Sequence, residues 1–400
     1  MPGRELEVLL VGVGGYGAGY ARVVLEAGGE LGLRLAGVAD PLASRSPLYR
    51  ELERLGVPVT DTVEEFYRRA GAELAVVSSP IQFHCPQTVA AAGAGSDVLC
   101  EKPLAATVEE GLRMLEARER AGVAVSIGYQ WSISPQILRL KRDIMAGRFG
   151  APGRFRCLVL WPRDEKYYRR AGWAGRLRDD AGRWVLDSPV NNACAHFLHN
   201  MLFLLGGRLD ASARPRRLSA ELYRANDIEN YDTGALRVLT EAGNELLFLA
   251  THAVRERRGP LFRLEFEEAL VEYGAQAGGI RVRYRSGGEE DYGEPAAGHR
   301  EKLAEAARLR RQGGRPVCGI EAALPHTMCV GGAQESAGGV TDFPRREVVV
   351  EGEPGSRRTW VRGLGEALAD CYERFLLPAE AGLPWARPGR PVDLAGGGGR

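Results

Sequence analysis

Short apolar runs alternate with longer helical patterns over the first 130 residues. These runs resemble buried strands and cover Glu7–Gly12, Arg34–Ala39, Leu74–Ser78, Asp97–Cys100 and Val123–Ile127. The clearest helical pattern between them covers residues 107–121, where Thr107 and Glu110 have the spacing of a capping box and Gly122 follows as a stop signal. Continuously apolar strands that alternate with helices predict a parallel sheet with helices on both faces.

From about Gly153 the pattern changes to longer strand-like segments separated by turn residues. These segments are Arg154–Trp161, Ala235–Thr240, Glu245–Thr251, Leu261–Phe266 and Ile280–Tyr284. Their spacing favours a largely antiparallel sheet. One strong helical pattern, Val190–Leu205, interrupts them, and its start is marked by Ser188 as a capping residue and Pro189 at the first helical position.

Three parts of the chain follow from this pattern. We predict a doubly wound α/β Rossmann domain over residues 1–128 and an α+β domain with a large, mostly antiparallel open sheet over 129–336. Residues 337–400 form a C-terminal extension with a strand, a helix and a glycine-rich tail that is either flexible or an edge strand with a frayed end. Because monomers rarely leave the face of an open sheet uncovered, we expect a homodimer or homotetramer built on this sheet, with the extension at an edge or on a neighbouring subunit.

Charge and composition exclude several classes of protein. The chain has 53 basic and 52 acidic residues, so its net charge of +1 indicates neither nucleic acid nor a membrane surface as a partner. The early apolar run Val8–Val13 is too short to span a bilayer and lacks the basic flank of a signal peptide. Seven cysteines without a CxxC pair fit reduced thiols, so we expect a cytoplasmic protein.

A glycine-rich loop directly follows the first predicted strand. Gly12, Gly14 and Gly17 match GxGxxG, and a helix is expected to begin near Tyr16. The first glycine permits a tight turn, the second lets the backbone approach a pyrophosphate, and the third allows close packing of helix on strand. The helix N-terminus, including Gly15 and Tyr16, then offers a partial positive charge to the anion. The alternative is a purely structural glycine turn.

Asp40 ends the second predicted strand and is the expected ligand of the two ribose hydroxyls of the cofactor. Its charge would repel a 2′-phosphate, which favours NAD. Arg45, with Ser44, lies in the following loop and leaves NADP open, because a guanidinium there can pair with that phosphate.

Three further stretches carry a resemblance to a known family. They are Ser78–His84, Cys100–Leu104 and the helix at 190–206, and together with the glycine loop they resemble the glucose–fructose oxidoreductase/inositol dehydrogenase/MocA family from about residue 6 to Ser336. The resemblance implies an NAD(P)-dependent oxidoreductase that transfers a hydride to or from a carbinol carbon of a sugar, inositol or related polyol. It also implies that Ser79, Pro80, His84, Glu101 and Lys102 contact the cofactor.

Lys102 and the helix after Pro189 carry the expected chemistry. By the resemblance, Lys102 touches the reacting oxygen; read alone, Glu-Lys-Pro is a turn before a helix. Hydride transfer from a carbinol needs a base for the hydroxyl proton, and histidine suits this role because its pKa lies near neutral pH. Asn192, His196 and His199 have the spacing i, i+4 and i+7, so we expect them on one helix face that lines a polar cleft, with His196 as the base. Two core histidines are the alternative.

Asn192 departs from the family pattern, in which relatives that oxidise sugar hydroxyls usually have aspartate four residues before the histidine. An amide can orient His196 but cannot stabilise an imidazolium by charge. This departure keeps two rivals to a simple dehydrogenase open: an enzyme that uses NAD transiently for elimination or epimerisation of a sugar, and a non-catalytic dinucleotide- or ligand-binding protein.

Substrate selection is expected to come from aromatic and polar side chains. The candidates are Tyr129, Gln130, Trp131, Trp173, His199, His252 and His326. Aromatic faces with polar tips suit sugar rings, although the same residue types are common in protein cores. We expect no metal ion, because no carboxylate or cysteine stands at a matching offset from the two histidines except Asp187, which precedes the helix.

Overall fold

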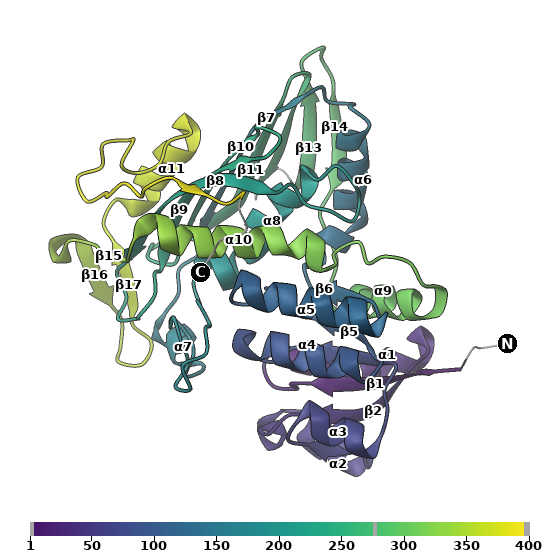
Figure 1. The fold of residues 1–400 in the computed structure, drawn as a ribbon. Coiled ribbons are helices and arrows are strands. Elements are labelled where there is room, and N and C mark those ends of the chain that lie inside the picture. The colour runs from purple at the N-terminus through teal and green to yellow at the C-terminus, as the bar shows by residue number, and fades with distance from the viewer. Residues whose placement is uncertain (1–3, 275–277, 396–400) are drawn as a thin grey trace. The chain divides into compact units, whose positions relative to one another are not determined.

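The computed structural model describes residues 4–274 and 278–395, and the chain divides into two units (Figure 1). The first unit comprises Met1–Ser134 and Ala296–Leu324, and the second comprises Pro135–Pro295 and Pro325–Arg400. This division differs from the predicted boundary at residue 128, because a later segment returns to the first unit. Helix α9 (His299–Gln312) inserts Leu303, Ala306 and Ala307 into the core of that unit.

A six-stranded parallel sheet forms the centre of the first unit. Its strands are β1 (Leu6–Val11), β2 (Leu33–Ala39), β3 (Val59–Thr60), β4 (Leu74–Val77), β5 (Asp97–Cys100) and β6 (Val125–Ile127). They lie in the order β3-β2-β1-β4-β5-β6, so the strand order reverses between β1 and β4. This is the doubly wound topology, which confirms the predicted Rossmann sheet.

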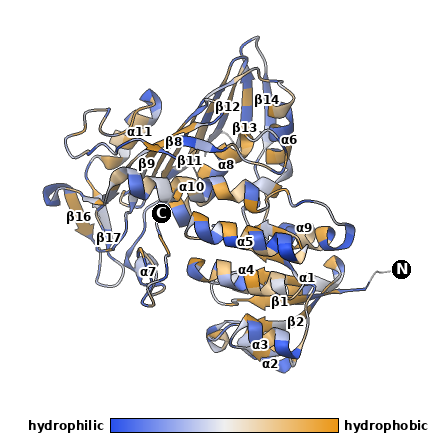
Figure 2. Cartoon of the chain, in the orientation of Figure 1, coloured by the Kyte–Doolittle hydropathy of each residue, from blue (hydrophilic) through white to orange (hydrophobic). Residues whose placement is uncertain are grey.

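Helices pack on the strands of this sheet. They are α1 (Gly17–Leu31), α2 (Tyr49–Arg54), α3 (Val63–Arg69), α4 (His84–Gly93), α5 (Val108–Ala121) and α9. Helix α1 packs beside α9, and α4 packs between α3 and α5. The predicted capping box of Thr107 and Glu110 is present at the start of α5, and Gly122 ends that helix with φ +65°. Figure 2 shows both hydrophobic and hydrophilic residues along α4 and α5, as expected for helices with one buried face.

The second unit is built on a sheet that has ten strands within the described residues. They are β7 (Pro152–Leu160), β8 (Pro215–Arg224), β9 (Thr233–Thr240), β10 (Glu245–Thr251), β11 (Arg258–Phe266), β12 (Ala269–Gly274), β13 (Gly279–Tyr284), β14 (Glu289–Gly293), β15 (Thr341–Asp342) and β18 (Val392–Asp393). The order is β14-β13-β12-β11-β7-β10-β9-β8-β15, with β18 also paired to β8. Neighbours are antiparallel except β7–β10 and β8–β15, so the mostly antiparallel prediction is confirmed.

The helices of the second unit include the predicted helix at 190–205, and here the structure corrects the prediction. They are α6 (Pro135–Met145), α7 (Glu165–Arg169), α8 (Ala195–Leu204) and α11 (Leu364–Arg374), with α10 (Ile320–Ala337) beginning in the first unit. Residues Pro189–Ala193 form a π-helical turn that Ser188 caps, and Cys194, at φ −108° and ψ 8°, separates this turn from α8. The assumed i, i+4 geometry of Asn192 and His196 is therefore wrong, because the helical period is interrupted between them.

The C-terminal extension covers part of one face of the large sheet. Apolar residues of β7, β8, β9 and β10, among them Leu158, Tyr223, Ala235 and Leu249, share one core with residues 343–386. The extension contains α11 and a hairpin of β16 (Val348–Glu351) and β17 (Arg358–Val361). The extension was expected at an edge of the sheet or on a neighbouring subunit, whereas the chain covers this face over these four strands with its own residues.

The same face carries charged side chains under and beyond the covering residues 343–386. Arg156 of β7 is buried and donates to the Tyr372 and Glu373 carbonyl oxygens at 2.9 and 2.6 Å. Further along the face, Arg263 forms ion pairs and Arg283 pairs with Glu272. The predicted edge strand in the tail is present as β18, whereas Gly396–Arg400 lie outside the described residues.

All seven cysteines are buried and free, as predicted. Among the described residues, no helix is both long and apolar enough to cross a membrane.

Candidate cofactor and substrate sites

The glycine-rich loop lies between β1 and α1. Gly12 adopts φ +82°, and its N–H donates to the Ala39 carbonyl oxygen of β2 at 3.1 Å. A Cβ atom on Gly17 would lie 2.2 Å from the Gly12 carbonyl oxygen, so no side chain fits there. These two glycines are therefore required by the turn and by the close contact between helix and strand, as the motif predicted.

The space in front of the loop is open. A Cβ atom on Gly14 or Gly15 would meet no heavy atom within 4 Å, and Gly14, Gly15 and Tyr16 are exposed. The first turn of α1 has no acidic side chain to compete for its positive end. The residues present therefore fit an oxyanion such as the pyrophosphate of a dinucleotide at this helix N-terminus.

Asp40 follows β2 beside this loop. Its Oδ2 accepts a hydrogen bond from the Val13 N–H at 2.9 Å, and its Oδ1 accepts one from the Leu42 N–H at 2.8 Å. Both carboxylate oxygens are fixed in this way, and each retains a lone pair that can accept a ribose hydroxyl. Arg45 lies nearby on the 3₁₀ turn Ala43–Arg45 and is exposed.

His84, predicted to lie beside the cofactor, joins two loops. Its Nδ1 lies 2.8 Å from the Pro103 carbonyl oxygen and its Nε2 lies 3.0 Å from that of Ser79. The ring is buried, and this burial lowers the pKa of His84. The ring thus lies between the loop that contains Ser79 and Pro80 and the loop that contains Lys102, and its neutral form donates a hydrogen bond to one of these two carbonyl oxygens. The hydroxyl of Ser79 donates to Gln87 Oε1 at 2.5 Å.

Glu101 is the centre of a buried charge cluster in the first unit. Its carboxylate pairs with the Lys302 ammonium and accepts a hydrogen bond from the Tyr20 hydroxyl at 2.6 Å. Its other oxygen accepts the Lys102 N–H at 3.1 Å. Burial would raise the pKa of Glu101, but the Lys302 charge and the hydrogen bonds from Lys302 and Tyr20 outweigh it and lower that pKa.

The cluster extends to the glycine loop. The Lys302 ammonium donates to the Tyr16 hydroxyl at 3.1 Å, and the ring of His299 stacks on that of Tyr16 at 4.3 Å between centroids. The Tyr16 hydroxyl in turn lies 3.3 Å from Gln130 Oε1. The sequence contains no signal for Lys302 as a site residue, because it lies 201 residues from Glu101 and outside every motif. Lys102 and Pro103, which were predicted as part of the site, directly follow Glu101 in the chain and are joined by a cis peptide bond.

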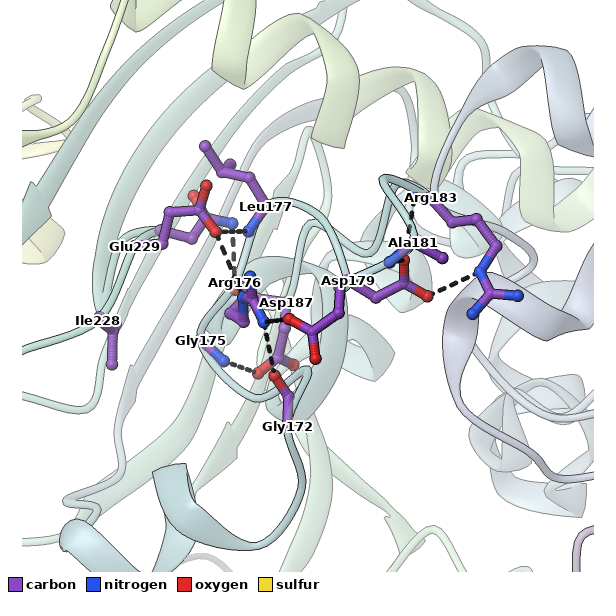
Figure 3. A network of polar contacts seen from close by, with 12 residues as sticks. Gly172, Gly175, Arg176, Leu177, Asp179, Ala181, Arg183, Asp187, Ile228 and Glu229 are labelled. Atoms are coloured by element: carbon purple, nitrogen blue, oxygen red, sulfur yellow. Dashed lines mark hydrogen bonds and ion pairs between the residues drawn. The ribbon is translucent and has the colours of Figure 1, made fainter. Parts of the chain in front are cut away.

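Asp187 organises the second unit just before the π-helical turn (Figure 3). Its Oδ1 accepts a hydrogen bond from Asn192 Nδ2 at 2.7 Å, and its Oδ2 accepts the Gly175 N–H at 2.6 Å. Arg170 lies 3.4 Å from the same Oδ2. Asn192, predicted as a positioning residue, is therefore held by the buried carboxylate of Asp187.

The three predicted histidines near α8 have different surroundings. His196 is partly buried, whereas His199 is only 1% exposed and stacks on Phe203. Burial, helped by the charges of His326 and Lys141, lowers the pKa of His199 well below its ordinary value. His326 is buried as well, and its Nε2 donates to the Val190 carbonyl oxygen at 3.0 Å. The expected polar stripe facing a cleft is wrong for His199, which fits the core-histidine alternative.

The remaining substrate candidates belong to different units. Tyr129, Gln130 and Trp131 are part of the first unit, and of these Tyr129 and Trp131 are buried. Trp173 and His252 are part of the second unit. Trp173 is half-buried, and His252 is buried with its Nδ1 donating to the Trp161 carbonyl oxygen at 2.8 Å.

Over residues 4–274 and 278–395, no three His, Cys, Asp or Glu side chains are grouped so that they could hold a metal ion.

The chain is similar to known oxidoreductases. Residues 6–129 match the model of a family described as "Oxidoreductase family, NAD-binding Rossmann fold". The chain is 31% identical over 204 residues to inositol 2-dehydrogenase 2 of Saccharopolyspora erythraea, which covers 48% of this chain and 57% of the relative. It is also 31% identical over 154 residues to 1,5-anhydro-D-fructose reductase of Ensifer adhaerens, and this match covers 38% of this chain and 44% of the relative. The chain thus spans about half the length of the curated relatives it matches.

Solved structures share the fold over most of the chain. The WlbA dehydrogenase of Bordetella pertussis, solved in complex with NADH and UDP-GlcNAcA, has a TM-score of 0.69 and 22% sequence identity, covering 84% of this chain and 97% of that one. At this identity the likeness shows a common architecture of both units.

Proposed function

We propose that the chain is an NAD(P)-dependent dehydrogenase of the glucose–fructose oxidoreductase/inositol dehydrogenase/MocA family, which its motifs resemble and whose NAD-binding Rossmann model matches residues 6–129. The reaction transfers a hydride between the nicotinamide ring and a carbinol carbon of a sugar, inositol or related polyol. The observation that carries the proposal is the open space at Gly14 and Gly15, at the N-terminus of α1, with the fixed carboxylate of Asp40 beside it.

The cofactor residues have separate tasks. The N-terminus of α1 neutralises the pyrophosphate, and Asp40 accepts the ribose hydroxyls, which favours NAD over NADP. Ser79, Pro80 and His84 follow β4, and the buried His84 ring lies against the carbonyl oxygens of Ser79 and Pro103. NAD, when bound, supplies the acceptor for the hydride.

Lys102 and His196 are the residues that we propose act on the hydroxyl oxygen and its proton. Lys102 is half-buried, and its backbone is fixed by Glu101, so its ammonium can donate a hydrogen bond to the oxygen that gains negative charge. His196 accepts the hydroxyl proton. Asn192 orients the site, and the Asp187 carboxylate that holds its amide provides a negative charge one hydrogen bond further away than the aspartate of typical relatives.

The test is a screen of polyols, aldoses and sugar acids with NAD and NADP, followed by the absorbance of the reduced nicotinamide. Lys102→Met should lower turnover by roughly 10²–10⁴-fold, the range of acid–base effects, and leave NAD affinity unchanged. His196→Ala is run in parallel. Near-normal turnover of Lys102→Met removes Lys102 from the chemistry.

The same screen separates the two rivals that Asn192 leaves open. Tightly retained cofactor, altered sugar and no net NADH would indicate transient use of NAD for elimination or epimerisation. Cofactor binding without any change in a sugar would indicate a binding protein.

Assembly and compartment belong to the same proposal. We place the enzyme in the cytoplasm, where its seven free cysteines would stay reduced. We propose a homodimer or homotetramer that uses the part of the sheet face not covered by residues 343–386, since the apolar part over β7–β10 is occupied by the chain itself.

A further inference from the structure

A cluster of arginine, aromatic and histidine side chains lies in the second unit, where β7 and β10 end. It consists of Arg163, Tyr167, Arg170, Trp173 and His252, and is called the arginine cluster below. The two guanidinium groups lie 4.6 and 3.8 Å from the centroid of the Tyr167 ring, and that of Arg170 also lies 4.8 Å from Trp173. Arg163, Tyr167 and Trp173 are only half-buried, so a small molecule can reach them.

The two arginines differ in their partners. Arg170 is balanced by the Asp187 carboxylate at 3.4 Å and donates to the Tyr167 carbonyl oxygen at 2.6 Å. Within the described residues, the Arg163 guanidinium has no hydrogen-bond or ion-pair partner, and its Nε is shielded from solvent. A shielded donor without an acceptor is unfavourable in the folded protein unless a ligand or water supplies one.

His252 adds an acceptor beside this donor. Its Nδ1 must carry the proton, because its partner is the Trp161 carbonyl oxygen, which can only accept. Burial, followed by the charge of Arg163, lowers the pKa of His252 to about 3, so the ring is neutral and Nε2 keeps its lone pair. Within the described part of the chain, this Nε2 is buried and has no hydrogen-bond donor.

We propose that the arginine cluster is a subsite that binds the oxyanion of an acidic sugar substrate, a carboxylate or a phosphate. Arg163 donates hydrogen bonds to the oxyanion, and His252 Nε2 accepts one from a neighbouring sugar hydroxyl. The aromatic rings of Tyr167 and Trp173 pack on the apolar side of the sugar. This inference rests on the proposed function for the reaction itself, and it narrows the substrate class from polyols in general to acidic sugars.

Two connections support a role in substrate binding. Arg170 and Asn192 share the Asp187 carboxylate, so the cluster is joined by hydrogen bonds to the turn that precedes the proposed base. The backbone of the cluster is also braced by the C-terminal extension: Glu165 receives the Gly355 N–H at 2.6 Å and donates its own N–H to the Arg357 carbonyl oxygen at 2.9 Å. A fixed frame around an unpaired cation is the arrangement expected of a preorganised anion site.

The experiment compares three substrate groups on the full-length protein with NAD: neutral polyols, sugar acids and sugar phosphates. The variants are Arg163→Met, Arg163→Lys and a matched control, Arg178→Met, which removes an exposed arginine stacked on Trp184 at 3.4 Å in the same segment. Binding of a sugar acid and of a sugar phosphate to the protein is measured in parallel by calorimetry, which requires no turnover.

Arg163→Met should raise the KM and the Kd for acidic sugars about 10- to 100-fold, the loss expected for a charge-assisted hydrogen bond. Arg163→Lys should recover part of the affinity, which also shows that the site folds, and Arg178→Met should have no effect. A preference for carboxylate or for phosphate identifies the oxyanion.

Two outcomes separate this inference from the proposed function. Equal affinity of wild type and Arg163→Met for every acidic sugar overturns the subsite, whatever the turnover. Loss of sugar-acid binding in Arg163→Met, without hydride transfer in the wild type, leaves the subsite standing and removes the dehydrogenase.

Discussion

Removing the Lys302 ammonium should destabilise the first unit strongly. The side chains of Lys302 and Glu101 are only 2% and 7% exposed, so neither charge is hydrated. Breaking a buried ion pair by removal of one partner costs about 3–5 kcal/mol, because the remaining charge stays buried. Against a total stability of about 5–15 kcal/mol, this is a large fraction. For a unit of this size we expect Lys302→Met to lower the Tm by roughly 6–20 °C.

The assay is urea unfolding of four proteins: wild type, Lys302→Met, Glu101→Gln and the double variant. The double variant buries no net charge and should recover most of the loss. Arg300→Met is the matched control, because Arg300 lies on the same helix α9 as Lys302 but forms an exposed ion pair with Glu30. This substitution should change the stability by no more than about 1 kcal/mol. A loss for Lys302→Met no larger than that of Arg300→Met would refute the reasoning.

The pH dependence gives a second test with a definite sign. The pKa of Glu101 is lowered in the folded protein, so its contribution to stability is present above the unfolded value of about 4.3 and is lost as the pH falls through the folded pKa. In Lys302→Met, burial without the ammonium should instead raise that pKa. The folded variant then binds a proton more readily than the unfolded chain. Its stability should therefore increase as the pH falls through the raised pKa toward the unfolded value of about 4.3. Parallel pH profiles of the two proteins would contradict this.

Three further predictions follow from the loop, the extension and the histidines. Gly14→Ala should weaken NAD binding at least about tenfold in calorimetry and leave the Tm unchanged. Gly17→Ala should instead unfold the loop, because its Cβ would lie 2.2 Å from a backbone oxygen. Equal effects of the two variants on the Tm would argue against an open space at Gly14. A chain ending at Asp342 should self-associate in light scattering, because it exposes the apolar face of β7–β10. A monodisperse product would contradict the role of residues 343–386 in covering this face. Burial lowers the pKa of His199 and His252, so stability should fall as the pH drops below about 6.5, and His252→Gln should reduce this slope in urea unfolding.

The Rossmann sheet could be predicted from the sequence because its signals are local. Each of its longer strands is mainly apolar, and the capping box at Thr107 and the glycine at 122 mark the ends of α5 within a few residues. The strand β3 was missed because only Val59 and Thr60 pair, which is too short a segment for a periodic pattern.

The candidate site was predictable only where a motif carried it. Spacing arguments assume a regular helix, and the π-helical turn at Pro189–Ala193 removed the expected face shared by Asn192 and His196. Lys302 and Asp187 belong to no motif, and their roles come from contacts that tertiary packing creates. The same holds for Arg163, whose guanidinium has no hydrogen-bond or ion-pair partner within the described residues, a property that no sequence pattern reports.

The attachment of residues 343–386 to the sheet has a kinetic and thermodynamic consequence. A face buried by a second subunit becomes exposed on dilution, since association depends on protein concentration. Here the covering segment is part of the same polypeptide, so its local concentration is constant and its docking is unimolecular. The hydrophobic surface of these strands should therefore stay protected even in the most dilute sample.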